Sequence, residues 1–346
     1  MQTAVMVGCG AMAEGWLRAI EAVNAQDPRV EITGFVDLNA ETARARRDGS
    51  AFPGAAVGTD LADMLGRLKP DMVFDIVIPP ARRGVVETAF DHGCDVLSEK
   101  PMGNTLDDAR ALLAARKARG RLHAVIQNRR HLEGIRRAKA FLDSGAIGPV
   151  AEVHCDFFIA PHFGGFRDEM DHVLLLDMAI HTFDAARFVA GVRPERVVCL
   201  ESNPPHSWYA HGASAMALFD CADGVTMSYR GSWCAEGAPT AWEASWRIVG
   251  HKGTLIWDGN TAFRAEVPGP RDGLLADMVP LEVPALSAPL LEGHAGVIAD
   301  FLAARANGTT PLTDTTDNIQ SLAMTFAAIR SAEEGGFVTI ERTTDE

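Results

Sequence analysis

Apolar and polar residues follow two different rhythms along this chain, and the change between them divides the sequence. In the first ~120 residues, short apolar runs alternate with segments of helical spacing, beginning with Thr3–Val7 and Glu14–Val23. This alternation predicts a parallel sheet with helices on both faces. The other strands expected here are Val30–Val36, Met72–Ile78, Val96–Ser98 and Leu122–Gln127, and the other helices are Ala40–Arg47, a segment from Pro79-Pro80 to about His92, and Leu106–Arg119. The stretch between Arg47 and Met72 reads as a loop rich in Gly and Ala.

From Val150 the apolar residues recur at every second position, which is typical of half-buried strands. Turn residues such as Ala222-Asp223-Gly224 separate the runs, so we expect an antiparallel sheet. Two helices, Gly293–Ala306 and Thr316–Ser331, should follow a long surface loop at Pro268–Pro289. The strands expected are Val150–Ile159, Arg196–Ser202, Ala213–Phe219, Val225–Ser232, Ala244–Val249 and Thr254–Trp257.

Composition narrows the class of protein. A chain of 346 residues with 47% hydrophobic content is long enough for two cores. No apolar run reaches the ~20 residues that span a bilayer, and the first residues lack the basic segment of a signal peptide. The six cysteines form no C-x-x-C pair, which argues against a disulfide framework or a zinc knuckle and suggests the cytoplasm. The net charge of −14 argues against a nucleic-acid or anionic-membrane partner.

A glycine turn follows the first expected strand. The segment Gly8-Cys9-Gly10-Ala11-Met12-Ala13 has the form G-x-G-x-x-A between a strand and a helix. Gly8 allows the tight turn, Gly10 lets the backbone approach a pyrophosphate, and Ala13 permits close packing of the helix. The helix N-terminus then offers N–H groups and a positive dipole to the phosphates. We therefore predict a dinucleotide site, although a plain tight turn has the same local pattern.

The acid that ends the second strand bears on the choice of cofactor. Asp37 follows Val36 directly, where a carboxylate can bind a ribose diol and repel a 2'-phosphate. This favours NAD over NADP. Three arginines further along could offset that preference in part: Arg44, Arg46 and Arg47.

An unusual polar stripe interrupts the apolar segment from Val173 to Ala190. Asp177, His181 and Asp184 share one face at helical spacing. Burying such groups costs several kcal/mol unless they are paired or face a cleft, so the stripe is expected to line a working pocket. An imidazole titrates near neutral pH and suits a base that accepts a hydroxyl proton. The alternative is a surface histidine bonded to its neighbours.

A second reactive group stands at the end of another expected strand. Glu99-Lys100-Pro101 follows Val96–Ser98, at the carboxyl edge of the parallel sheet. A lysine there can polarise a substrate oxygen, and the X-Pro bond after it is a candidate for the cis form. A surface lysine in a salt bridge is the alternative.

These motifs together resemble the Gfo/Idh/MocA family (glucose–fructose oxidoreductase, inositol dehydrogenase and rhizopine catabolism proteins) over essentially the whole chain. Their order and spacing carry the resemblance. The matching segments are Gly8-x-Gly10-x-x-Ala13, Pro79-Pro80, Glu99-Lys100-Pro101, Asn128-Arg129-Arg130, Ser144-Gly145-x-Ile147-Gly148 and Asp177-x-x-x-His181.

The resemblance implies an α/β Rossmann domain over residues 1–122 and an α+β domain with an open, mainly antiparallel sheet over residues 123–346. The late helices are expected to pack back on the first domain. Members typically oxidise or reduce a hydroxyl of a sugar, cyclitol or related polyol with NAD(H) or NADP(H). In similar proteins the sheet often forms the oligomer interface, so a homo-oligomer, a dimer or tetramer, is expected.

The resemblance also implies roles for single residues. Lys100 and His181 would flank the reacting hydroxyl, and Asp177 would orient the substrate or the imidazole. Glu99, Lys100, Pro79 and Pro80 would contact the cofactor beside the residues of the glycine turn and Asp37. The substrate candidates are Arg129, His162, Arg167, Asp171, His172 and Asp184; solvated loop polarity, or charge at a helix start for the arginine, is the alternative.

The sequence also fits two other functions. Some relatives retain a recycled nicotinamide for a non-redox elimination or glycoside cleavage, and others are non-catalytic proteins that respond to NAD(P). Lys100 and His181 are both present, which favours catalysis. Ala179 and Arg82-Arg83 replace residues frequent in the family, so substrate specificity does not transfer by analogy. Nothing in the spacing of His154, Asp156 and the later histidines forces metal ligands to converge, and we expect no metal.

Overall fold

The computed structural model describes residues 1–342 and divides into two compact units, each with its own sheet. The first contains Met1–His131 and Leu290–Gln320, and the second contains Leu132–Pro289 and residues 321–342. The first unit therefore runs beyond residue 122, because the strand at His123–Val125 pairs with its parallel sheet. The segment Leu290–Gln320 returns to this unit and brings one late helix with it.

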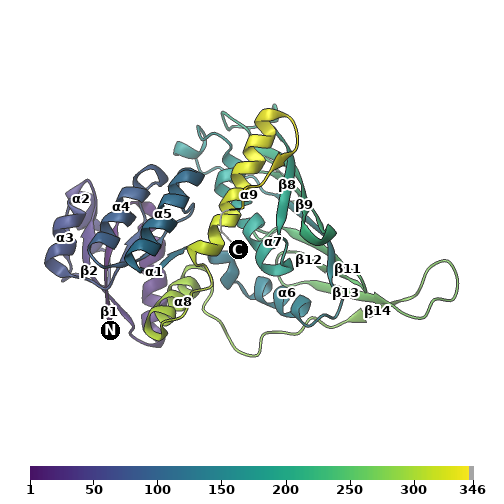
Figure 1. Ribbon diagram of the computed structural model, residues 1–346, viewed down its shortest axis with the longest axis horizontal. Coiled ribbons are helices and arrows are strands. Elements are labelled where there is room, and N and C mark those ends of the chain that lie inside the picture. Colours follow the sequence, from purple (N-terminus) through teal and green to yellow (C-terminus); the bar gives the residue numbers. More distant parts are fainter. Residues whose placement is uncertain (343–346) are drawn as a thin grey trace. The chain divides into compact units, whose positions relative to one another are not determined.

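Six parallel strands form the sheet of the first unit in the order β3-β2-β1-β4-β5-β6. This is the order of a doubly wound dinucleotide-binding sheet, whose ligands lie at the carboxyl ends of the strands. Figure 1 shows β1 and β2 among the helices of this unit. The strands are β1 Gln2–Val7, β2 Val30–Val36, β3 Ala56–Gly58, β4 Met72–Asp75, β5 Asp95–Ser98 and β6 His123–Val125. The helices are α1 Ala11–Gln26, α2 Ala40–Asp48, α3 Leu61–Leu68, α4 Pro79–Asp91, α5 Leu106–Arg119 and α8 Gly293–Asn307, with a 3-10 turn, η1, at Asn128–His131.

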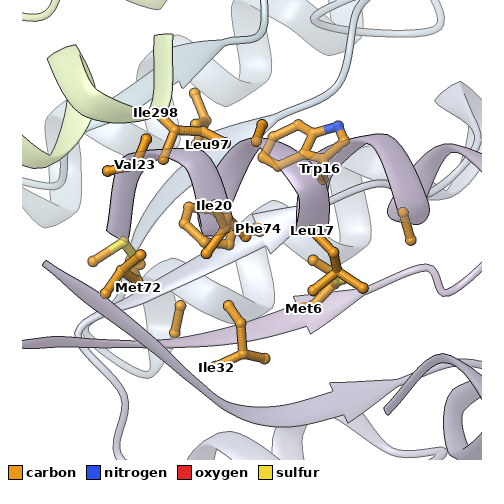
Figure 2. Close-up of a cluster of buried hydrophobic side chains, with 14 of the residues drawn as sticks. Met6, Trp16, Leu17, Ile20, Val23, Ile32, Met72, Phe74, Leu97 and Ile298 are labelled. Atoms are coloured by element: carbon orange, nitrogen blue, oxygen red, sulfur yellow. The ribbon is translucent and has the colours of Figure 1, made fainter. Parts of the chain in front are cut away.

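The apolar side of α1 packs on one face of this sheet together with α8. Figure 2 shows Trp16 and Ile20 of α1 beside Phe74 of β4, with Ile298 reaching in from α8. All four side chains are buried. Full burial of an aliphatic or aromatic side chain contributes about 1.5–3 kcal/mol, so this core fixes the helix that starts at the glycine turn.

The expected loop between Arg47 and Met72 is wrong, because it contains β3 and α3. Asp60 caps α3 by accepting a hydrogen bond from the Asp63 amide at 2.9 Å, and Met64 and Leu65 supply its buried face. This helix is only two turns long, so its apolar stripe is too short to stand out among glycines and alanines. The strand expected at Met72–Ile78 ends earlier, at Asp75, and Pro79 begins α4.

Nine strands form the sheet of the second unit in the order β14-β13-β12-β11-β7-β10-β9-β8-β15. Neighbouring strands are antiparallel except β7 and β10, which run parallel. The sheet is therefore mixed but mainly antiparallel, as predicted. The strands are β7 Val150–Phe158, β8 Pro194–Ser202, β9 Ser214–Cys221, β10 Thr226–Ser232, β11 Ser245–Gly250, β12 Thr254–Trp257, β13 Phe263–Pro268, β14 Met278–Leu281 and β15 Val338–Thr339.

The expectation of a loop throughout Pro268–Pro289 is wrong at one place, since β14 pairs with β13 there. The helices of this unit include α6 Glu133–Asp143 and α7 Ile180–Ala190, and α9 Thr315–Glu334 belongs to it from Ser321 onward. Short 3-10 turns lie at Gly165–Arg167 (η2) and Ala222–Gly224 (η4), and a π-helical turn, η3, at Leu174–Ala179 precedes α7. No helix within residues 1–342 has the length and apolar character needed to cross a membrane.

Candidate active site

The glycine turn joins β1 to α1 and needs both glycines for different reasons. Gly8 has a φ of +87°, and a Cβ there would lie 2.7 Å from the carbonyl carbon and oxygen of Ile76. A Cβ on Gly10 would meet no atom within 4 Å. Gly10 is also the N-cap of α1 and makes no side-chain capping bond, so its side of the turn is open to a ligand. Ala13 is buried where α1 meets the sheet, as the motif predicts.

Two charged side chains fix the backbone of this turn. Asp37 accepts a hydrogen bond from the Cys9 amide at 2.8 Å through Oδ2, and one from the Asn39 amide at 2.9 Å through Oδ1. Arg46 donates from Nη2 to the Gly10 carbonyl oxygen at 2.9 Å and from Nε to that of Cys9 at 3.2 Å. Burial, and then the Asp37 charge, raise the pKa of the Cys9 thiol to about 12, so this cysteine stays protonated.

Exposed apolar side chains stand at the carboxyl ends of three neighbouring strands. Met12, Leu38 and Ile78 are 48%, 96% and 70% exposed, and they follow β1, β2 and β4. Ile78 precedes Pro79 and Pro80, which form the first turn of α4. Apolar surface beside a few fixed polar groups is typical of small-molecule sites. Sequence reasoning missed Leu38 and Ile78; their position directly after a strand end was the available signal.

The residues of this edge fit a dinucleotide. The uncapped N-terminus of α1 carries positive dipole and donor N–H groups for phosphates. The open space at Gly10 lets the backbone approach them, and the Asp37 carboxylate suits a ribose. The exposed side chains of Leu38 and Ile78 offer apolar surface to a flat ring.

Lys100 follows β5 at the same edge of the sheet, and its peptide bond to Pro101 is cis, as anticipated. Glu99 is only 7% exposed. It accepts hydrogen bonds from the Lys100 amide at 2.9 Å and from Trp16 Nε1 at 3.0 Å. Burial raises the pKa of this carboxyl, but the hydrogen bond and charge of His294 and the charge of Lys100 outweigh burial and bring the pKa below its usual value. Glu99 is therefore a charged support beneath Lys100.

A buried arginine braces the other side of this segment. Arg82 lies on α4 and binds Asp75 through Nε at 2.9 Å, with both side chains almost fully buried. It also donates to the carbonyl oxygens of Val77, at 2.6 Å, and Pro101. Breaking a buried ion pair costs about 3–5 kcal/mol, so Arg82 ties the residues after β4 to those after Lys100.

In the second unit, the segment that carries Asp177 and His181 is not one regular helix. Residues Leu174–Ala179 form a π-helical turn, and α7 begins at Ile180. The prediction of an α-helix throughout Val173–Ala190 is therefore wrong over its first part, and the argument from i, i+4 spacing does not apply to Asp177. π-helical turns occur frequently at functional sites.

The three polar residues of this segment have different surroundings. Asp177 accepts a hydrogen bond from Arg167 Nε at 2.8 Å, which joins two predicted site residues. His181 is buried within α7. Asp184 is completely buried and accepts a hydrogen bond from Ser321 Oγ at 2.7 Å, so α9 supplies its partner.

The other substrate candidates of this unit contact different partners. His162 stacks on Trp208 with ring centroids 3.6 Å apart, and Asp171 lies 3.3 Å from His211. His172 has a φ of +51° and binds Glu201 at 2.5 Å through Nδ1. The hydrogen bond to Glu201 is the main cause that raises the pKa of His172.

Arg129 lies in the first unit and is buried in η1 beside Arg130. Arg130 donates to the Leu312 carbonyl oxygen at 2.9 Å and to Asp317 at 2.6 Å. Neither arginine is a solvated charge at a helix start, so that alternative is wrong. Within residues 1–342, no group of three or more His, Cys, Asp or Glu side chains has the arrangement of a metal site.

Sequence comparison identifies the family. The profile of the oxidoreductase family with an NAD-binding Rossmann fold matches residues 3–127, and that of the GFO/IDH/MocA C-terminal domain matches residues 135–256. D-apiose dehydrogenase of Paraburkholderia graminis is 29% identical over 344 residues, which cover 97% of this chain and 89% of that protein.

Solved structures show the same fold. An oxidoreductase from Agrobacterium radiobacter in complex with NAD+, L-tartaric acid and magnesium matches with a TM-score of 0.85, 23% identity and 98% coverage of both chains. Levoglucosan dehydrogenase in complex with NADH and L-sorbose matches with a TM-score of 0.83 and 18% identity, covering 99% of this chain and all of that one. With both of its units matched, the chain belongs to the Gfo/Idh/MocA family of NAD-binding oxidoreductases.

Proposed function

We propose that this protein is a dehydrogenase that transfers hydride between a hydroxyl-bearing carbon of a sugar, cyclitol or related polyol and NAD. The observation that carries the proposal is Lys100, set at the carboxyl edge of the sheet that bears the glycine turn and supported by Glu99. The names of relatives support the substrate class, since they include D-apiose dehydrogenase and inositol 2-dehydrogenase.

A few residues share the steps of the proposed reaction. Bound NAD supplies the hydride acceptor at its nicotinamide ring. The Lys100 ammonium polarises the hydroxyl oxygen and stabilises negative charge that develops on it. The His181 imidazole accepts the hydroxyl proton as general base, and Asp177, held by Arg167, orients the substrate or the imidazole. In the reverse direction His181 returns the proton to the carbonyl oxygen.

The preference for NAD over NADP is part of the proposal. Asp37 places a carboxylate where a 2'-phosphate would need a cation. Arg46 already donates to the backbone of the glycine turn, and Arg44 and Arg47 pair with Glu41 and Asp48. These partners support the view that the arginines do not offset Asp37.

Among the substrate candidates, Arg167 enters the proposal through its bond to Asp177. Arg129, His162, Asp171 and His172 stay predictions. Asp184 is left out because its carboxylate serves the packing of α7 and α9.

We also propose that the protein forms a homo-oligomer through the sheet of the second unit. Leu200 of β8 lies opposite Met216 of β9, and Leu218 lies two residues further along the same strand. All three are exposed, which makes an apolar patch that a second copy would cover. The six cysteines are buried and none forms a disulfide within the described residues, which supports a reducing compartment such as the cytoplasm.

The test is the formation of NADH and NADPH, followed by absorbance, across a panel of cyclitols, aldoses and sugar acids. We expect NADH from one or a few polyols, lost in Lys100→Met and His181→Ala while NAD binding persists. Silence across the panel would contradict the proposal. If the purified protein also released NAD only on denaturation, a recycled cofactor in a non-redox reaction would replace it, and exchangeable NAD would favour a regulatory role.

A further inference from the structure

Three elements of the first unit meet at the buried carboxylate of Glu99. Trp16 of α1 donates to Oε1 at 3.0 Å, and His294 at the start of α8 has Nε2 3.5 Å from the same oxygen. The second oxygen, Oε2, accepts from the Lys100 amide at 2.9 Å. One side chain thus connects the helix of the glycine turn, the backbone of the proposed catalytic lysine, and a helix that returns from the far end of the chain.

Two neighbouring side chains fix the orientation of the His294 imidazole. Nδ1 lies 3.4 Å from the Nδ2 atom of Asn128, and Nε2 faces Glu99. The imidazole also stands edge-on to the Trp16 indole, with centroids 6.1 Å apart. Both donors of Oε1 are consequently held in place by each other as well as by the carboxylate.

Simple packing does not require this arrangement. Burying an ionised carboxylate is costly unless hydrogen bonds satisfy it, and an apolar residue would fill the same volume without that cost. Here the donors saturate Oε1 and leave Oε2 to fix the amide of the neighbouring residue. A displacement of about 1 Å in a reacting group can lower a rate by about 100-fold. A rigid anchor on the Lys100 backbone is therefore useful to catalysis.

We propose that Glu99 and His294 are positioning residues, which lock the backbone of Lys100 to the glycine-turn helix and so fix where its ammonium group stands. Glu99 makes the contact, and His294 holds Glu99 by donating from Nε2. The kinetic consequence rests on the proposed function; the anchoring of the Lys100 amide does not.

Four variants separate positioning from folding. Glu99→Gln replaces one carboxylate oxygen with an NH₂ group. This NH₂ donor must then face another donor, either Trp16 Nε1 or the Lys100 amide, so one of the two hydrogen bonds is lost. His294→Leu removes the donor to Glu99. His294→Gln offers an amide N–H in a similar place and should restore the hydrogen bond to Glu99. His92→Leu is the control, because this exposed histidine caps the far end of α4.

Two readouts are needed on the full-length protein. Amide hydrogen exchange at Lys100 should quicken at least about tenfold in Glu99→Gln and His294→Leu, and stay near wild type in His294→Gln and His92→Leu. With the polyol that gives NADH fastest, kcat should fall about 100-fold in Glu99→Gln and about 10-fold in His294→Leu. The Kd of NAD should change less than threefold, and His294→Gln should restore kcat.

The outcomes are distinct. Unchanged exchange in Glu99→Gln would overturn the anchor, and equal losses in His294→Gln and His294→Leu would overturn the donor role of His294. Faster exchange with an unchanged kcat in an active enzyme would overturn the link to catalysis. If the wild type turned over no polyol, the proposed function would fail while the exchange data still decided the anchor.

Discussion

Adding one methyl group to each glycine of the turn should separate the stability of the fold from the binding of the cofactor. In Gly8→Ala the new Cβ would lie 2.7 Å from two backbone atoms of Ile76. The alanine would also have to adopt a φ of +87°. The positive φ costs about 1–2 kcal/mol and the overpacking about 1–3 kcal/mol, so the free energy of unfolding should fall by about 2–5 kcal/mol. That loss corresponds to a Tm lower by at least about 4 °C.

Gly10→Ala is the matched variant. Gly10 has a φ of −66°, which alanine adopts, and its Cβ would meet no atom within 4 Å. The free energy of unfolding should therefore stay within about 0.5 kcal/mol of wild type. The methyl group fills space that a pyrophosphate needs, so the Kd of NAD should rise at least about tenfold, or about 1.4 kcal/mol.

Thermal unfolding without cofactor and calorimetric titration with NAD measure the two effects on both variants. A Gly8→Ala protein as stable as wild type would refute the steric argument. A Gly10→Ala protein that binds NAD normally would refute the placement of the phosphates at this turn.

Three further predictions concern single side chains. Asp37→Asn should weaken NAD more than NADP when both are titrated, because the charge that repels a 2'-phosphate is gone; an unchanged ratio of the two Kd values would contradict the ribose assignment. Burial, and then the charges of Arg116 and Arg82, lower the pKa of His123 to about 3, so the folded protein holds this ring neutral. An unfolded histidine takes up a proton near pH 6.5, so stability is lost as pH falls below that value, and wild type should lose about 2 kcal/mol more than His123→Gln between pH 7 and 5 in urea unfolding. Equal losses of stability in the two proteins would show that His123 does not contribute to the pH dependence of unfolding. Arg167→Leu should lower kcat with little change in the Kd of NAD, because Asp177 loses the partner at 2.8 Å; Arg187→Lys, on the buried side of α7, is the control, and equal kcat in both would count against a role for Asp177.

Local patterns predicted much of the fold. The helix at Leu106–Arg119 and the strand at Thr254–Trp257 have the expected bounds, because a capping threonine, a terminal glycine and alternating apolar residues mark them. The helix α3 and the edge strand β14 were missed, since each is short and has few buried apolar side chains. The π-helical turn at Leu174–Ala179 was also missed, because its apolar residues fit an α-helix equally well.

The functional residues were predictable to different degrees. Short motifs of a few neighbouring residues predict the glycine turn and Lys100. The supports of Glu99 do not, since Trp16 is 83 residues away in sequence and His294 is 195 residues away. Such contacts depend on how α1 and α8 pack on the sheet, and no local pattern records that. The same reason hides the partner of Asp184, because Ser321 lies 137 residues further along the chain.

The most direct test of the account follows the hydride itself. The polyol that gives NADH fastest would be prepared with deuterium on its carbon atoms and incubated with NAD and the enzyme. Mass spectrometry would then measure the mass of the NADH formed. The account predicts one deuterium in the nicotinamide ring, and no labelled NADH with Lys100→Met. Unlabelled NADH, or label found only in the solvent, would contradict direct transfer from the carbinol carbon.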